Sequence, residues 1–236
     1  MSDKDTIERE RQFKPFEDRM LKAGLDRVVI TTFRHYYYQL LSGGTGRISR
    51  LQIEPVENVP DMEQLKDYSQ AGHAAIKKAV VIKLNGGLGT GMGMEKAKSL
   101  LEVKNGLSFL DICARQVLHF RSRYGCNLPL VLMNSFHTRS DSLAVLENYP
   151  ALHDEIPLDF LQHKVPKIDR QTLGPVNWKQ NPELEWCPPG HGDLYTALVT
   201  SGMLETLLAK GFEYAFVSNA DNLGAVLDVQ ILGYFS

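Results

Sequence analysis

Cysteine is scarce in this chain of 236 residues, and Cys113, Cys126 and Cys187 form no C-x-x-C pair. A small, odd number of cysteines without metal-ligand spacing argues against a disulfide framework and against a structural zinc site. Charge of one sign is also lacking, since the formal net charge is −2. The composition therefore favours neither nucleic acid nor an anionic membrane as a partner.

Long hydrophobic runs are absent too, and none approaches the length that a membrane-spanning helix needs. The first residues, MSDKDTIERERQFK, are charged and lack the apolar core of a signal peptide. We therefore expect a cytoplasmic protein. The length allows one large α/β domain with an appendage.

The most informative stretch is AVVIKLNGGLGTGMGMEKAK, which spans residues 79–98. Ala79 to Leu84 is a short apolar run with β-branched residues, interrupted only by Lys83, so it predicts a buried strand of a parallel sheet. Asn85 to Gly93 then contains five glycines in nine residues, and Glu95 to Leu101 is rich in helix formers. A strand, a glycine loop and a helix leave backbone N–H groups free for a phosphate or a nucleobase edge, with Lys98 close by.

Two familiar glycine loops do not fit this stretch. A Rossmann dinucleotide loop would need glycine where Met92 or Met94 stands, and a Walker loop would need glycine in place of Ala97 before Lys98 and Ser99. A glycine-rich turn without a ligand remains the alternative.

The rest of the chain alternates helical and strand patterns. Two motifs, Asn134-Ser135-Phe136 and Asn219-Ala220-Asp221, follow predicted strands and share the edge of the glycine loop, where ligands of open α/β sheets collect. The glycines of 42–46 are interpreted as a linker, and Asp111 and His119 as surface or capping residues. We expect helices over 3–23 (with a break at Pro15), 26–41, 61–77, 107–124, 138–148, 194–208 and 228–235, and further strands over 128–133, 158–162 and 214–218.

Four segments together resemble the signature of the UTP–glucose-1-phosphate uridylyltransferase family, also called UDP-glucose pyrophosphorylases. They are L-N-G-G-L-G-T at 84–90, L-V-L-M-N-S-F at 130–136, P-P-G-H-G-D at 188–193 and V-S-N-A-D-N at 217–222. The resemblance covers Lys78 to the end of the chain.

This resemblance implies an α/β fold of the Rossmann-like nucleotidyltransferase (GT-A-like) kind, a mixed, mainly parallel sheet flanked by helices. Residues 1–77 would form an N-terminal helical segment and linker, and residues 78–236 the N-terminal part of the catalytic domain. Family members are longer and continue with more of the sheet, a second phosphate-binding lysine and a β-helix domain. The sheet is therefore expected to be incomplete.

The reaction that the resemblance implies is uridylyl transfer, in which glucose 1-phosphate attacks the α-phosphorus of UTP and pyrophosphate leaves. Such chemistry depends on positioning and charge neutralisation. Lys98 and Asp221 are the catalytic candidates: Lys98 neutralises phosphate oxygens and Asp221 binds Mg²⁺. The alternatives are a solvated surface lysine and an aspartate that caps the next helix.

The resemblance also implies the substrate contacts. Backbone groups of 84–87 would face uracil and phosphates, Gln162 would hydrogen-bond uracil, and Gly190 would contact the base. His191 would bind the sugar phosphate and Asn219 a sugar hydroxyl. The substrate-binding candidates are thus Leu84, Asn85, Gly86, Gly87, Gln162, Gly190, His191, Asn219 and Asp221.

Two other functions stay open from the sequence. One is a non-catalytic fragment that binds UTP or a UDP-sugar but lacks the C-terminal half, and the other is a UDP-sugar pyrophosphorylase of different sugar specificity. Where the family often has proline before the phosphate-binding lysine, this chain has Ala97, and Lys96 adds a nearby cation.

Overall fold

The computed structural model describes residues 3–88 and 96–236. The chain forms two compact units, one of Met1–Glu57 with His163–Thr196 and one of Asn58–Gln162 with Ala197–Ser236. This grouping differs from the division after residue 77 that the sequence suggested. Residues 58–77 belong with the sheet, and a later segment belongs with the N-terminal helices. Each unit is described by itself.

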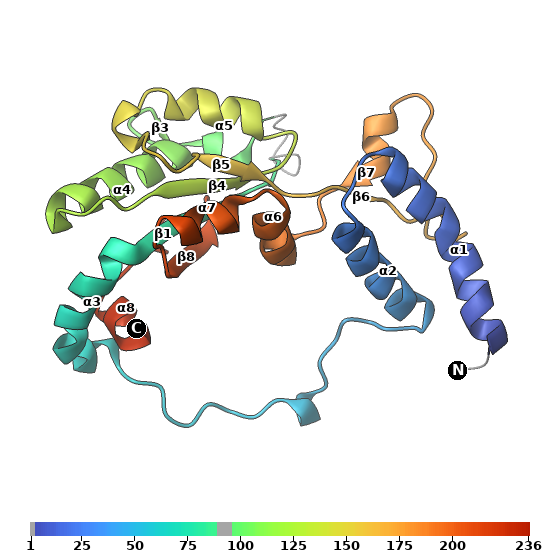
Figure 1. Cartoon of the computed structure of the whole chain (residues 1–236), viewed down its shortest axis with the longest axis horizontal. Helices are drawn as coiled ribbons and strands as arrows, with labels where there is room; N and C mark the ends of the chain where they lie inside the picture. The colour runs from blue at the N-terminus through green and yellow to red at the C-terminus, as the bar shows by residue number, and fades with distance from the viewer. Residues whose placement is uncertain (1–2, 89–95) are drawn as a thin grey trace. The chain divides into compact units, whose positions relative to one another are not determined.

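The second unit is built on a four-stranded sheet with the strand order β5-β4-β1-β8, which can be followed in Figure 1. Its strands are β1 (Ala79–Asn85), β4 (Leu130–Asn134), β5 (Asp159–Leu161) and β8 (Tyr214–Asn219). All three pairings are parallel. The predicted α/β class and its parallel sheet are confirmed.

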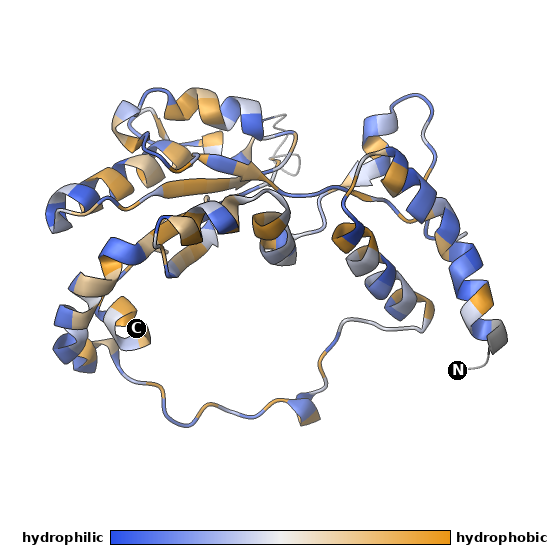
Figure 2. Ribbon diagram, viewed as in Figure 1, coloured by the Kyte–Doolittle hydropathy of each residue, from blue (hydrophilic) through white to orange (hydrophobic). Residues whose placement is uncertain are grey.

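Helix α4 (Phe109–Tyr124) covers the sheet and closes the main core, in which Leu110 and Val117 pack with Leu130. Figure 2 shows β4 as hydrophobic along its length, as expected for a strand buried on both faces. A capping box of Ser108 and Asp111 begins the helix, so the capping role predicted for Asp111 is confirmed.

Shorter elements surround this core. Helix α3 (Ser69–Ala75) packs closely on α8 (Val229–Phe235), because Gly72 and Gly233 have no side chains at the crossing. The remaining elements of this unit are η2 (Met62–Tyr68), α3 (Ser69–Ala75), η3 (Ile76–Lys78), η5 (Lys98–Leu100), β2 (Glu102–Lys104), β3 (Leu107–Ser108), α5 (Arg139–Leu146), η6 (Pro150–Leu152), α7 (Met203–Ala209) and α8 (Val229–Phe235), while α6 (Leu194–Thr200) crosses the boundary between the units.

Two predicted helices are interrupted. The helix expected over 61–77 is a run of two 3₁₀ helices and the short α3. The helix expected over 194–208 is divided into α6 and α7, because Gly202 has a left-handed φ of 75° that an α-helix cannot accommodate.

The first unit begins with an antiparallel helix pair, α1 (Asp3–Lys22) and α2 (Arg27–Leu41). The predicted break at Pro15 is wrong, because α1 continues through it. Phe13 and Phe16 on either side are buried in the core shared with α2, and this packing offsets the backbone hydrogen bond that proline removes. Asp26, the first residue of the helix expected over 26–41, caps α2 and accepts from the Val28 N–H at 2.8 Å.

The segment from 165 to 189 packs on these helices. Arg19 of α1 forms an ion pair with Glu185 at 3.1 Å and donates to the carbonyl of Val176. The segment contains an antiparallel pair of short strands and a 3₁₀ helix, followed by a second 3₁₀ helix. The remaining elements of this unit are η1 (Arg50–Gln52), β6 (Val165–Pro166), η7 (Pro182–Glu185), β7 (Trp186–Cys187) and η8 (His191–Asp193). None of the helices among the described residues is long and apolar enough to cross a membrane.

Candidate functional site

The carboxyl ends of the four parallel strands meet at one edge of the sheet. Asn85, Asn134 and Asn219 are the last residues of β1, β4 and β8, and Gln162 follows β5 directly. The prediction that the glycine loop shares this edge with residues 134–136 and 219–221 is therefore confirmed. It is the edge at which open parallel sheets bind ligands.

The side chain of Asn85 belongs to a buried polar network beneath this edge. Its Nδ2 donates to Asn134 Oδ1 and to Ser142 Oγ, both at 2.7 Å, and its carbonyl accepts from Thr138 Oγ1 at 2.7 Å. Because these groups are already satisfied within the protein, the side chain of Asn85 positions the strand end.

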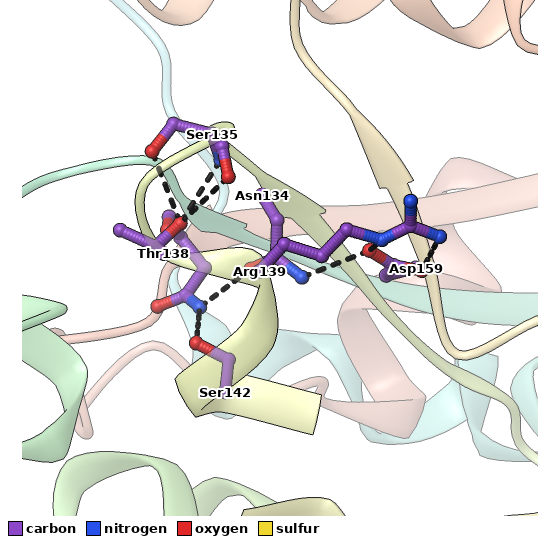
Figure 3. A network of polar contacts seen from close by, with 7 residues as sticks. Asn134, Ser135, Thr138, Arg139, Ser142 and Asp159 are labelled. Atoms are coloured by element: carbon purple, nitrogen blue, oxygen red, sulfur yellow. Dashed lines mark hydrogen bonds and ion pairs between the residues drawn. The ribbon is translucent and has the colours of Figure 1, made fainter. Parts of the chain in front are cut away.

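The network ends on a buried carboxylate, as Figure 3 shows. Asn134 donates to Asp159 at 3.1 Å, and Arg139 reaches both oxygens of Asp159, with Nε at 2.8 Å and a terminal nitrogen at 3.2 Å. The side chain of Asp159 is only 6% exposed, and a buried carboxylate needs such partners. The sequence analysis did not identify Asp159. Its contact with Asn134 depends on the pairing of β4 with β5, which no local sequence pattern predicts.

Gln162 lies directly over Gly86. Its backbone N–H donates to the carbonyl of Asn134 at 2.8 Å. The residue is 6% exposed, and Nε2 has no hydrogen-bond partner among the described residues. The structure thus brings together two predicted uracil-binding residues and leaves an amide donor ready for a ligand.

The glycine loop is closed at its base. The carbonyl of Gly87 accepts from the N–H of Lys98 at 3.0 Å, and Leu88 pairs with Ala97 in an antiparallel bridge. The loop residues Gly89 to Glu95, with Thr90, Met92 and Gly93, lie outside the described residues. The predicted helix is wrong over 96–101, because the backbone returns antiparallel and forms only a 3₁₀ turn before β2.

Lys98 and Asp221, the two catalytic candidates, form an ion pair with 2.7 Å between Nζ and Oδ2. Lys98 comes from η5 and Asp221 from the loop after β8. Their side chains are 48% and 27% exposed, so both are accessible from solvent. Because Lys98 is paired with a carboxylate, it differs from the solvated surface lysine that was the alternative.

The other two candidates at this edge are neighbours in the β1–β8 pair. Leu84 is the register partner of Asn219, and its carbonyl accepts from the N–H of Ala220 at 3.0 Å. The carbonyl of Leu84 is therefore used within the sheet, while Asn219 is exposed at the strand end.

Gly190 and His191 belong to the first unit. Gly190 has φ 104° and ψ 180°, a conformation that is essentially restricted to glycine. The exposed His191 begins η8, and Asp193 at the end of η8 accepts from the backbone N–H of His163 and contacts its ring Nδ1 at 2.8 Å. These contacts fix the backbone that carries His191.

The described residues contain no group of three or more His, Cys, Asp or Glu side chains that could hold a metal ion. A single carboxylate such as Asp221 fits Mg²⁺ only when phosphate oxygens supply further ligands. The donor set thus fits a metal shared with a bound nucleotide.

The carboxyl edge of this parallel sheet carries an accessible lysine, a carboxylate and an amide that has no partner among the described residues. Such an edge is typical of the nucleotide-binding class of α/β proteins. Comparison with known proteins identifies the family within this class. The family model of UTP–glucose-1-phosphate uridylyltransferase matches residues 30–236. The chain belongs to this family.

Individual relatives agree. A probable UTP–glucose-1-phosphate uridylyltransferase of Schizosaccharomyces pombe is 45% identical over 195 residues, which cover 80% of this chain and 38% of the relative. A crystal structure of UDP-glucose phosphorylase from Trypanosoma brucei superposes with a TM-score of 0.85 at 43% identity, covering 95% of this chain and 48% of that one.

A variant of UDP-glucose pyrophosphorylase from Leishmania major, in complex with UDP-glucose, gives a TM-score of 0.85 at 40% identity and covers 95% of this chain and 47% of that one. The chain thus spans less than half the length of these relatives.

Proposed function

We propose that this chain is the nucleotide-binding part of a uridylyltransferase that forms UDP-glucose and pyrophosphate from UTP and glucose 1-phosphate. The observation that carries the proposal is the ion pair of Lys98 with Asp221 at the carboxyl edge of the sheet. It places a cation and a carboxylate together beside the base of the glycine loop.

Lys98 would bind the phosphates. In the free protein its ammonium contacts Asp221 at 2.7 Å, and the same ammonium can turn to a nucleotide because it is half-exposed. Contact with phosphate oxygens would neutralise charge as a sugar-phosphate oxygen attacks the α-phosphorus in line and pyrophosphate leaves. Asp221 would then be free to ligate a cation.

Gln162 would recognise the base. A side-chain amide carries one donor and one acceptor group, and the uracil edge presents a carbonyl next to an N–H. Nε2, which lacks a partner among the described residues, would donate to the uracil carbonyl while Oε1 accepts from the ring N–H. Because Gly86 has no Cβ, there is room beside it for the side-chain amide of Gln162.

Mg²⁺ is the cofactor that we propose for Asp221. Asp221 would hold the ion, and the chemistry supplied there would be neutralisation of phosphate charge. Chain residues would do the rest: Lys98 holds phosphate, and Gln162 and Gly86 hold the base.

The remaining assignments rest on resemblance to the family. Gly190 would contact the base, His191 the sugar phosphate and Asn219 a sugar hydroxyl, and the backbone of 84–87 would line the nucleotide. A cytoplasmic location likewise stays a prediction.

A second function is favoured by one observation. The chain covers 38% of its yeast relative and 48% of the trypanosomal structure, so it could bind a uridine nucleotide without completing the reaction. Binding without turnover would then be the activity of this chain.

Calorimetry with UTP, UDP-glucose and ATP, combined with an assay of pyrophosphate release, tests both functions. We expect UTP to bind more tightly than ATP in the presence of Mg²⁺. Pyrophosphate release with glucose 1-phosphate supports the transferase, and binding alone supports the fragment. Competition with other sugar 1-phosphates decides the sugar specificity. Equal affinity for UTP and ATP would contradict both proposals.

A further inference from the structure

A lysine is buried in the middle of the central strand. Lys83 of β1 is 3% exposed, and it lines a small pocket with Cys113 and Gln116 of α4. Its Nζ donates to Ser218 Oγ at 2.8 Å and to the carbonyl of Ala225 at 3.1 Å. The side chain thus lies between the sheet and α4.

Nothing in the described part of the chain pairs this ammonium with a carboxylate. Its other neighbour is the ring of Phe216, whose centroid lies 5.9 Å from Nζ. Burial lowers the pKa of Lys83, because a charge is costly to remove from water. An apolar residue would fill the same space at less cost, so the lysine needs a reason beyond packing.

The partners of Lys83 lie on either side of Asp221 in the chain. Ser218, its register partner across the β1–β8 pair, lies just before the end of β8. Ala225 lies beyond Asp221, in the loop that connects β8 to α8. One ammonium therefore contacts the chain before and after Asp221.

Two further side chains hold the same loop from α4. Gln116 Nε2 donates to the carbonyl of Leu223 at 3.1 Å, and Cys113 Sγ donates to the carbonyl of Ala220 at 3.4 Å. Lys83 is the charged member of this set, and charge-assisted hydrogen bonds are roughly twice as strong as neutral ones.

We propose that Lys83 is a positioning residue, whose buried ammonium holds the loop of residues 219–225 in shape so that Asp221 is presented to the metal and phosphate. The functional part of this inference rests on the proposed function. A preordered loop loses less conformational entropy when the protein binds a ligand. This smaller entropy loss offsets the free-energy cost of burying the charge.

The test compares Lys83→Met with Ile82→Ala in the full chain. Methionine keeps the volume but leaves the carbonyl of Ala225 without its donor. Ile82 is buried in the same strand, but a side chain at the next position of a strand points to the opposite face. Ile82→Ala therefore controls for general destabilisation.

Hydrogen exchange of the backbone amides in the ligand-free chain is the first measurement. We expect the amides of 219–226 to exchange faster in Lys83→Met, with amides of β4 unchanged relative to the wild type. Ser218→Ala, which removes one partner of the ammonium and little volume, should give a smaller increase. It decides the matter if Lys83→Met does not fold. Unchanged exchange of the loop in the variants that fold would overturn the inference.

The affinity for UTP is the second measurement, with and without Mg²⁺. We expect Lys83→Met to lose about tenfold in the presence of Mg²⁺, as for removal of groups that orient a metal ligand, and little without it. The same loss in Ile82→Ala would show a general effect and overturn the positioning role. If the wild type binds no UTP, the proposed function fails, and the exchange experiment still decides whether Lys83 orders the loop.

Discussion

The side-chain amide of Gln162 lies against the Cα of Gly86, so close that a Cβ at this position would be 2.7 Å from Cδ of the glutamine. One strand end supplies the glycine and another supplies the amide. Nε2 has no partner among the described residues. The amide can occupy this position because glycine at 86 has no Cβ.

Gly86→Ala should therefore weaken uridine-nucleotide binding. The new methyl group displaces the flexible end of Gln162, and loss of one or two hydrogen bonds to uracil lowers the UTP affinity about tenfold. Calorimetry with UTP and ATP measures the effect, which should be confined to UTP. Gly87→Ala is the matched control, since a Cβ there meets no atom within 4 Å. Wild-type UTP affinity in Gly86→Ala would contradict the assignment of Gln162.

Lys98→Ala should lower the affinity for UTP, by about tenfold or more, because a charge-assisted contact to phosphate is lost. The thermal unfolding of the ligand-free chain should stay the same, since an exposed ion pair contributes only about 0–1 kcal/mol. Lys77→Ala is the control, because Lys77 is an exposed lysine just before the amino end of β1. A variant that binds UTP as the wild type does would refute the role of Lys98.

Asp221→Asn should change UTP affinity in opposite directions with and without a divalent cation. Without a divalent cation, the variant should bind UTP slightly better, because the carboxylate no longer competes for Lys98 or repels phosphate. With Mg²⁺ present the order should reverse, since asparagine is a poorer ligand for a hard cation. Titrations with UTP in EDTA and in Mg²⁺ measure both. The Mg²⁺ assignment is abandoned if the variant keeps the gain from Mg²⁺.

Gly190→Ala should destabilise the first unit locally. Its φ of 104° lies in a region that a residue with a Cβ avoids, at a cost of about 1–3 kcal/mol. Gly192→Ala is the control, because a Cβ there meets nothing within 4 Å and its φ lies outside the left-handed region. Chemical denaturation and hydrogen exchange near Asp193 report the difference. Equal stability of the two variants would show that the backbone at Gly190 is not strained.

The helix-forming and strand-forming patterns were predicted well where local chemistry decides them. The buried strand at Ala79, the start of α2 beside Asp26 and the end of α4 at Tyr124 follow from hydrophobic periodicity and from the residues at helix ends. Errors occurred where packing overrides local preference. Pro15 stays within α1 because its neighbours are buried, and Gly202 divides a helix whose periodicity reads as continuous.

In the candidate site, too, some features were predicted from local sequence and others depend on tertiary contacts. Glycine spacing and strand ends located the edge of the sheet that carries the candidate site, because parallel strands carry their carboxyl ends to one side. The use of the Asn85 side chain within the protein could not be predicted from the sequence, since its partners Asn134 and Ser142 come from distant segments. Asp159, which completes that network, carries no sequence signal of its own.

The sequence by itself determined the parallel sheet, the glycine loop and the residue types available for nucleotide chemistry, because these depend on short-range periodicity and spacing. Only the tertiary structure decided which of these residues meet. It pairs Lys98 with Asp221, sets Gln162 on Gly86, and places the buried ammonium of Lys83 beneath the Asp221 loop. Such contacts join segments far apart in the chain, and chain folding rather than local propensity brings them together.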